Sequence, residues 1–338
     1  MKTKITVLIA ATLMLSQTAN AKTRLIVNCF WPSKHHVCTE ILPDWISEVK
    51  RVTDGRVTGI IPPKSVAAPP EQLSAVESGI ADVSIQFNGL IQNRVSGPMV
   101  AMQPFVGTNN AEAMSKALWE TNRKFFPNEF DSVHLLSQFV ISPGQLFSQT
   151  DKPIVSYEDF SSRKIWSLPG TLAVISKASG AGVVSSPAAK SNEIISRGVV
   201  DGHFGLDAQA VTALQLTPYT KSLTSFKGTI FTSSFSFFIN KDKWAEISSE
   251  DQKAIMEVSG SKFGAKVGAS WDKQNEDALV VLEKAGVPIV EAEQGFEEKL
   301  AELSQPITTK WLEATSTAGI DGAAALEFYK KRASEISN

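Results

Sequence analysis

The feature that most constrains the fold of this chain is a regular alternation of strand and helix patterns. Strands are expected over 24–29, 56–61 and 81–87, where short apolar runs end at turn residues. Between them, apolar residues recur at helical spacing over 37–52 and again over 70–79. Because strands that alternate with helices build α/β sheets, this order predicts an α/β fold with a largely parallel sheet.

The alternation continues through the second half of the chain. Ser249 and Gln252 form a capping-box pattern, which predicts a long helix that runs to about Lys284. Two further helices are expected near 296–316 and 321–335. A length of 338 residues, at ~150 residues per domain, indicates two domains, and we expect both to be α/β.

The N-terminus has the pattern of a secretory signal peptide. Basic residues open the chain, an uncharged apolar run spans 5–15, and the small-x-small sequence 19–21 precedes Lys22. The apolar run is shorter than the ~20 residues that a membrane span needs, so an uncleaved anchor is the weaker interpretation. We expect cleavage after Ala21 and an exported protein located in a bacterial periplasm.

Composition excludes two classes of partner and scaffold. The 33 Lys and Arg residues face 35 Asp and Glu residues with no basic block, which argues against a nucleic-acid partner. Two cysteines are too few for a disulfide scaffold. In an oxidising compartment, Cys29 and Cys38 either form one disulfide or stay as two buried thiols. Neither belongs to a CxxC motif, and the adjacent His35 and His36 make a poor ligand pair, so no metal site is expected.

Local enzyme signatures are absent from the sequence. It contains no G-x-S-x-G elbow, H-E-x-x-H motif, P-loop or G-x-G-x-x-G turn, so no nucleotide or other cofactor is expected. A hydrolase with a Ser, His and Asp triad stays an alternative, because triads are not local in sequence. An exported two-domain α/β chain without such motifs is typical of a protein that captures a ligand between its domains.

Five segments, in order along the chain, resemble one family. They are Phe30 to His36 with Thr53 to Val57, Gln72 to Val83, Phe160 to Gly170, Arg197 to Gly202, and Phe238 to Ile255. The chain resembles the solute-binding proteins of tripartite ATP-independent periplasmic (TRAP) transporters, a DctP-like family. The resemblance implies a type II-like periplasmic binding fold: two α/β lobes, hinge strands and a long helix that braces both lobes. The helix opening at Ser249 is the candidate brace.

The same resemblance implies the division of the chain and its function. Lobe I is expected to comprise 22–147 plus 234–275, and lobe II 148–233 plus 276–338. The protein is then expected to be a receptor and not an enzyme, and to capture a small organic ligand, most commonly an organic acid. It would act as a monomer and deliver this ligand to a permease of one small and one large membrane subunit, driven by an ion gradient. The alternative within this fold is a sensor subunit for a membrane kinase.

One position departs from the family pattern. In the third segment the family usually has an Arg that clamps a ligand carboxylate, because a guanidinium fork matches two carboxylate oxygens. Trp166 stands in that register here. Another donor then replaces the Arg, or the ligand is not a simple carboxylate. If Trp166 belongs to the core instead, Arg163 or Arg94 is the next candidate for pairing with an anion.

Aromatic residues at strand ends and loops suggest a planar or amphipathic ligand. Trp31, Trp166, Phe204 and Phe235 would rim the cleft and offer stacking area, with core packing as the alternative. His35 lies in the first family segment and is a further ligand-binding candidate. Polar candidates complete the set: Asn88 follows the third strand, and Asp207 either contacts the ligand or caps a helix over 208–216.

Overall fold

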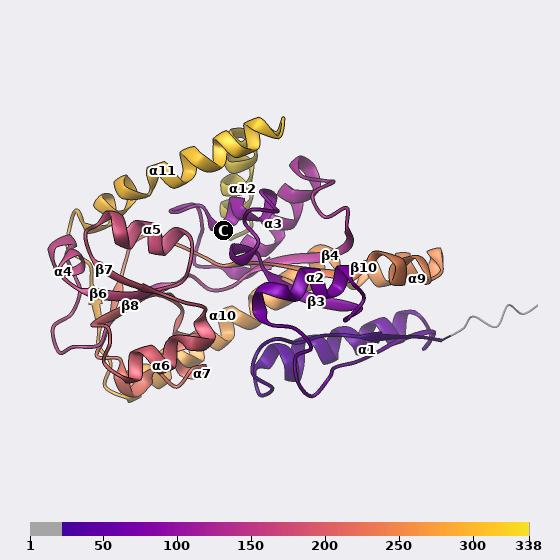
Figure 1. Ribbon diagram of the computed structural model, residues 1–338, viewed down its shortest axis with the longest axis horizontal. Helices are drawn as coiled ribbons and strands as arrows, with labels where there is room; N and C mark the ends of the chain where they lie inside the picture. The colour runs from indigo at the N-terminus through magenta and orange to yellow at the C-terminus, as the bar shows by residue number, and fades with distance from the viewer. Residues whose placement is uncertain (1–21, 338) are drawn as a thin grey trace, which may run out of the picture.

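The structure is a computed structural model that describes residues 22–337, so the predicted signal peptide and its cleavage site lie outside the described residues. Two sheet systems lie side by side and are bridged by a long helix (Figure 1). We call the part built on β1–β4 and β10 lobe I, and the part built on the six-stranded sheet lobe II. No helix within the described range is long and apolar enough to cross a membrane.

Lobe I contains a parallel strand pair beside a three-stranded antiparallel sheet of order β3-β10-β4. Its strands are β1 (Thr23–Ile26), β2 (Val57–Ile60), β3 (Val83–Phe87), β4 (Val133–Val140) and β10 (Ser234–Asn240). Its helices are η1 (Val37–Ile41), α1 (Leu42–Val52), η2 (Pro69–Glu71), α2 (Gln72–Glu77), η3 (Asn88–Leu90), η4 (Gly97–Met102), α3 (Ala111–Phe125), α8 (Lys241–Ala245) and α9 (Ser249–Glu257).

Lobe II contains one mixed sheet of order β11-β9-β5-β8-β6-β7. Its strands are β5 (Gln145–Ser148), β6 (Lys164–Ser167), β7 (Gly182–Ser185), β8 (Gly202–Leu206), β9 (Ser222–Ser225) and β11 (Ile289–Glu291). Its helices are α4 (Tyr157–Ser161), α5 (Thr171–Ala178), η5 (Ala188–Lys190), α6 (Ser191–Ser196), α7 (Ala208–Ala213), η6 (Thr217–Tyr219) and α11 (Phe296–Thr317). The expectation of a largely parallel sheet is wrong, because β10 is antiparallel to both neighbours and so is β5.

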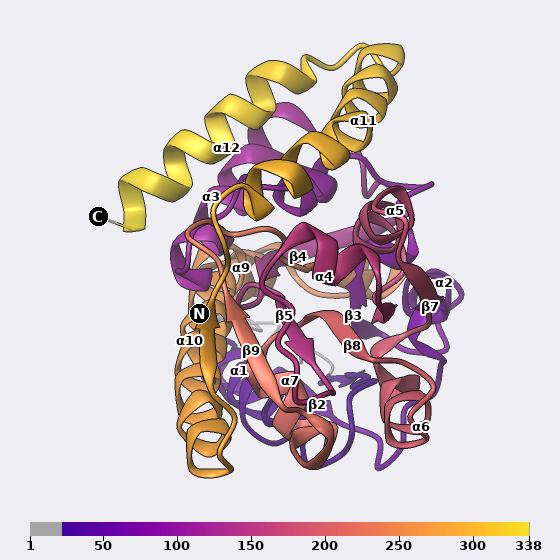
Figure 2. The same cartoon turned by 90° about the vertical axis from the view of Figure 1, so that its left-hand side faces the viewer.

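The chain changes lobe three times between consecutive strands, the third time between β10 and β11. It leaves lobe I after β4 and enters lobe II at β5, then returns between β9 and β10. The last helix, α12 (Gly322–Ser337), packs against α3 of lobe I, as Figure 2 shows. The expected division assigned 276–338 to lobe II, whereas α12 packs on lobe I.

The long helix expected from Ser249 to Lys284 is two helices in the structure. Ser248, not Ser249, caps the first one, because its Oγ accepts a hydrogen bond from the Asp251 N–H at 3.1 Å. The second helix, α10 (Gly260–Lys284), begins where Gly260 has a φ of +53°, a left-handed conformation that suits glycine and interrupts the helix. α10 packs against α3 and β4 in lobe I and against α7 in lobe II, so α10 is the brace.

Candidate ligand-binding cleft

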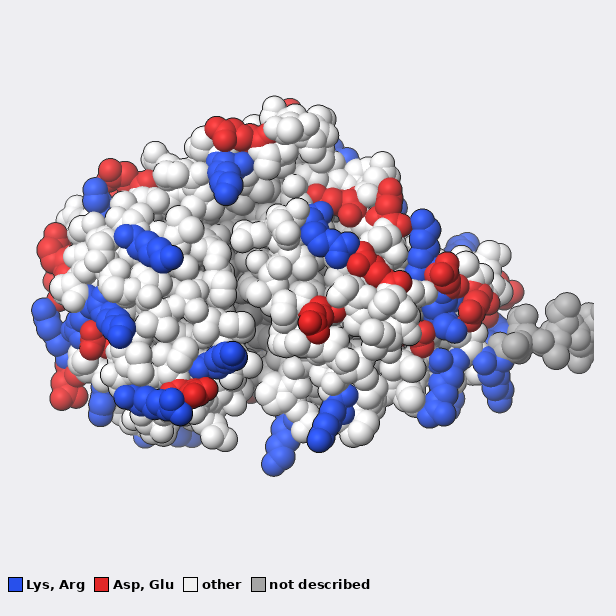
Figure 3. Space-filling view, viewed as in Figure 1, with Lys and Arg blue, Asp and Glu red and all other residues white. Residues whose placement is uncertain are grey.

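A cavity of about 250 Å³ lies between the two lobes and is lined by residues of both. Figure 3 shows the surface hollowed along this boundary, with mostly uncharged residues on both sides of the hollow. Its walls come from the loop after β1, the ends of β3 and β10, the loops after β6 and β8, and helices α7 and α10. Strands of both lobes have one end at this boundary, so their ends and the adjoining loops line the cavity.

The lobe I wall is aromatic. The ring of Trp31 lies 5.5 Å from that of Phe235 and 6.0 Å from that of Trp271, measured between centroids. The ring of Phe87 lies 5.4 Å from that of Phe235. Phe30 stacks on Trp31 at 3.9 Å, so five rings from four separate segments form one continuous face. Such a face offers stacking area to a flat ligand.

A disulfide closes the loop that carries part of this wall. Cys29 and Cys38 are bonded, with their Cα atoms 5.7 Å apart. Trp31 and His35 lie inside the loop, which is further tied by hydrogen bonds from the Cys38 and Thr39 N–H groups to the His35 carbonyl. The cross-link therefore limits where the two cavity-lining rings can lie.

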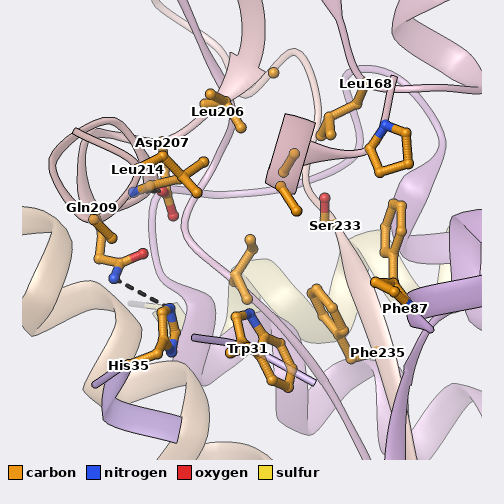
Figure 4. A pocket seen from close by; sticks show the side chains of 18 of the residues that line it. Trp31, His35, Phe87, Leu168, Leu206, Asp207, Gln209, Leu214, Ser233 and Phe235 are labelled. Atoms are coloured by element: carbon orange, nitrogen blue, oxygen red, sulfur yellow. Dashed lines mark hydrogen bonds between the residues drawn. The ribbon is translucent and has the colours of Figure 1, made fainter. Parts of the chain in front are cut away.

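The lobe II wall is aliphatic. Leu168 follows β6, Leu206 ends β8 and Leu214 follows α7, and all three line the cavity opposite the rings (Figure 4). The segment 187–189 adds a proline and two alanines to this wall. These side chains provide apolar contact without the flat faces that lobe I presents.

Asp207 is the one carboxyl among the residues that line this cavity. As expected, it caps α7, because its Oδ1 accepts a hydrogen bond from the Ala210 N–H at 2.7 Å. Its Oδ2 is buried and has no partner among residues 22–337. Burial raises the pKa of Asp207 to about 7, and Asp272 adds to the rise, although the Ala210 N–H and the nearby Trp271 indole oppose it.

One hydrogen bond connects the two walls. Nε2 of Gln209 on α7 lies 3.3 Å from Nε2 of His35, as Figure 4 shows. Burial, together with the neighbouring His36, lowers the pKa of His35 to about 3, so its ring is neutral at pH 7. His35 and Gln209 also line a second cavity of about 460 Å³. The hydrogen-bonded pair therefore lies where the two cavities adjoin.

Trp166 does not line the cavity, which corrects the expectation that it stands in the cleft. Its side chain is fully buried in the core of lobe II, and its Nε1 donates to the Ser186 Oγ at 2.8 Å. Arg163 instead donates to Thr150 and to the Lys152 carbonyl, and Arg94 pairs with Glu77. Neither arginine lines the cavity, so neither replaces the missing clamp there.

Asn88 and Phe204 also lie outside the cavity lining. Asn88 is buried against β10, where its Nδ2 donates to Ser234 at 3.1 Å and its Oδ1 accepts from Ser236 at 2.9 Å. Phe204 packs edge-on against Phe160 at 5.6 Å in the core of lobe II. Of the seven predicted ligand-binding residues, the structure thus brings together Trp31, His35, Asp207 and Phe235.

Sequence reasoning did not single out three residues of the site: Phe87, Gln209 and Trp271. Phe87 ends the predicted third strand immediately before Asn88, so its position at the strand end was a usable signal. Trp271 belongs to the apolar stripe of α10 and looks like a core residue in sequence. The described part of the chain contains no group of three or more His, Cys, Asp or Glu side chains that could hold a metal ion.

Comparisons with known proteins agree with this architecture. The sequence model of "bacterial extracellular solute-binding protein, family 7" (DctP) matches residues 27–314. The chain is 34% identical over 328 residues to "outer membrane transporter protein TsaT" of Comamonas testosteroni, with 96% of each protein covered.

Solved structures show the same two-lobed fold. A TRAP periplasmic solute-binding protein from Bordetella bronchiseptica, with bound (R)- and (S)-mandelate, is 31% identical with a TM-score of 0.86, over 93% of this chain and 99% of that one. A marine metagenome TRAP solute-binding protein specific for aromatic acids is 22% identical with a TM-score of 0.85, over 94% and 100%. The chain therefore belongs to the DctP family of bacterial extracellular solute-binding proteins, the receptors of TRAP transporters.

Proposed function

We propose that this protein is the periplasmic receptor that captures an aromatic acid and presents it to a TRAP permease made of a small and a large membrane subunit. The observation that carries the ligand class is the aromatic wall of lobe I around a cavity that is otherwise aliphatic. A ligand ring placed on this wall gains stacking and apolar burial at once.

The relatives support an acid as the ligand. The Bordetella bronchiseptica protein, 31% identical to this chain, holds mandelate, an aromatic acid. Proteins of the same fold hold metahydroxyphenylacetate and benzoate. We expect the ligand of this chain to be a single aromatic ring that carries one acid group.

Capture is expected to involve closure of the lobes about the segments between β4 and β5 and between β9 and β10. The receptor is expected to start at Lys22, to work as a monomer without catalysis, and to feed uptake driven by an ion gradient. A sensor subunit for a membrane kinase would use the same cleft. The genes beside the gene for this protein distinguish the two functions. Finding permease genes there would support transport, and finding a membrane-kinase gene in their place would contradict it.

A thermal-shift titration of residues 22–338 tests the ligand class. Mandelate, benzoate and 3-hydroxybenzoate are compared with lactate and cyclohexanecarboxylate, which lack the aromatic ring. A ligand at 100 times its Kd stabilises the protein by ~2.7 kcal/mol, a shift that is easily measured. Stabilisation by the aromatic acids alone supports the proposal. No response to any of them between pH 5.5 and 9 contradicts it.

Two matched variants test whether the ligand binds in this cavity. Trp31→Ala removes a ring of the cavity wall and should weaken binding by ~1–3 kcal/mol, about fivefold to 150-fold. Trp244→Ala removes a ring that stacks on His134 at 4.2 Å, away from the cavity, and should leave the Kd unchanged. Equal losses in both variants would place the ligand elsewhere.

A further inference from the structure

The cavity raises a question about how it holds an acid. Receptors for anions usually supply an arginine or lysine, but of the described residues that line the cavity none is Lys or Arg. An anion in an apolar, water-poor space without a donor is strongly disfavoured. The polar side chains that line the cavity are therefore the first candidates for the donor.

Two of these polar groups have no partner of their own. Oδ2 of Asp207 and Nε1 of Trp271 are both buried and unpaired within residues 22–337, and both residues line the cavity. Each side chain is at least nine-tenths buried, with exposures of 1% and 2%. Unpaired polar atoms are costly in a protein interior, so a bound molecule that pairs with both removes that cost.

We propose that the ligand's acid group is bound by hydrogen bonds from the protonated carboxyl of Asp207 and from the indole N–H of Trp271, so that ligand and receptor share one proton. This inference rests on the proposed function and specifies how the acid is recognised without a cation. The proton comes from solvent and is held between Asp207 Oδ2 and a ligand oxygen.

The local structure aims Asp207 for this role. Its Oδ1 is fixed by the Ala210 N–H at 2.7 Å, which leaves Oδ2 for the proton. Figure 4 shows the carboxyl directed toward the space above His35 and Trp31. The indole N–H of Trp271 comes from α10, which packs against α7, and it lies near enough to the Asp207 carboxyl to lower its pKa. Two donors from two elements thus converge on one end of the cavity.

The charges around Asp207 favour the protonated form. On α10, Asp272 contributes a like charge, and its oxygens already accept from the Ala111 and Glu112 N–H groups and from Ser142. In the facing loop, burial lowers the pKa of His35 to about 3 and that of His36 to about 4, so both rings are neutral.

Among the described residues that line this cavity, none is Lys or Arg and the one His is neutral, so none of them offers a positive charge to a second carboxylate. On β8, burial lowers the pKa of His203 to about 3, so this ring is neutral as well. With its pKa near 7, Asp207 is largely protonated below neutral pH, and an anionic ligand raises that pKa further. Two carboxyls that cannot both be ionised then share one proton, as in other buried carboxyl pairs.

The proposal predicts the sign of the pH dependence. Binding of the anion requires protonated Asp207, so affinity is constant below about pH 6 and falls up to tenfold per pH unit above about pH 7. Benzamide and benzyltrimethylammonium are probes that do not need a protonated Asp207. Ionised Asp207 would accept a hydrogen bond from the benzamide N–H and would attract the positive charge of benzyltrimethylammonium. Their affinities should hold or rise over the same range.

Asp207→Asn is the matched variant. Asn caps helices as well as Asp does, its amide donates a hydrogen bond, and it does not titrate. Titration calorimetry with benzoate and mandelate from pH 5.5 to 9 should give near wild-type affinity at pH 5.5 and no fall at high pH. The wild type should lose affinity at high pH and should take up a proton on binding. The proton uptake is measured as a dependence of the binding enthalpy on the ionisation enthalpy of the buffer.

The outcomes separate this inference from the proposed function. Tight, pH-independent binding of benzoate to the wild type overturns proton sharing while the receptor function stands. Loss of benzoate binding in Asp207→Asn at every pH, with the fold intact, also overturns it, because the carboxylate then acts as an acceptor. Binding of benzyltrimethylammonium in place of any aromatic acid overturns both.

Discussion

The two lobes use the same residue types in opposite ways. Lobe I directs the rings of Trp31, Phe87 and Phe235 toward the cavity, whereas lobe II buries Trp166 and Phe204 in its core. Lobe II then faces the cavity with leucine, proline and alanine side chains. An aromatic residue near a strand end therefore identifies a binding surface only where no other segment covers that end of the strand.

This asymmetry suggests an order of events in capture. The ligand ring can dock on the aromatic wall while the lobes are apart, because the wall is complete within lobe I and α10. We expect lobe II then to close with its aliphatic side chains and to bring Asp207 and Gln209 over the ligand. Each side of this comparison can be tested by a substitution.

The largest effect is expected from Trp166→Ala. Truncating a fully buried Trp that donates to Ser186 should lower the free energy of unfolding by ~3–5 kcal/mol. Protein that remains folded should bind its ligand with unchanged Kd. Urea denaturation and calorimetry on the same sample measure both quantities. A large rise in Kd with little loss of stability would show that Trp166 reaches the ligand and that the contrast between lobes is wrong.

The same residue shows what sequence reasoning could reach. The family resemblance placed Trp166 in the register of the family arginine, and in the structure this residue lies on the strand β6. Whether its ring faces the cleft or the core depends on Ser186, twenty residues later, which accepts from its indole. Long-range contacts of this kind leave no local pattern in a sequence.

Removal of the disulfide is expected to have the next largest effect. A cross-link that closes a loop this short contributes about 2–3 kcal/mol in the chain-entropy model. Cys29→Ser with Cys38→Ser should lower the free energy of unfolding by about that amount. It should also weaken binding, because Trp31 and His35 lie within the loop. Equilibrium unfolding and Kd measurements check this. An unchanged Kd would show that the rings hold their places without the cross-link.

Three further features differ in how far the sequence could predict them: the Asp207 cap, the helix break at Gly260 and the Gln209–His35 pair. The capping role of Asp207 follows from local spacing and is confirmed. The break at Gly260 was missed, because a glycine inside an apolar helical pattern is tolerated unless its φ is positive. The pairing of Gln209 with His35 joins residues 174 positions apart, and no sequence pattern connects them.

A smaller effect is expected from Phe235→Leu, which keeps apolar volume in the lobe I wall but removes a ring. Loss of ring–ring contact should weaken aromatic acids by ~0.5–1.5 kcal/mol, up to about tenfold, with little change for cyclohexanecarboxylate. Phe237→Leu is the control, since Phe237 packs on Trp45 and Phe263 in the core. Competition binding with the two acids measures the ratio. An unchanged ratio in Phe235→Leu would mean that the aromatic wall does not select aromatic ligands.

The smallest effect is expected from Gln209→Ala, which removes the one hydrogen bond described above between the two walls. A neutral hydrogen bond contributes ~0.5–1.5 kcal/mol, so the Kd should rise about twofold to tenfold. Because the pair exists only when the lobes meet, and because it separates the two cavities, the change should appear as faster ligand release.

The His35 partner makes this prediction specific in pH. With its pKa near 3, His35 stays neutral from pH 5 to 9, so the bond contributes equally over that range. Stopped-flow release rates should therefore differ between wild type and Gln209→Ala by a constant factor. A factor that changes between pH 5.5 and 7.5 would show that His35 titrates in the assembled site, and the lobe contact would then act as a pH-sensitive latch instead of a simple hydrogen bond.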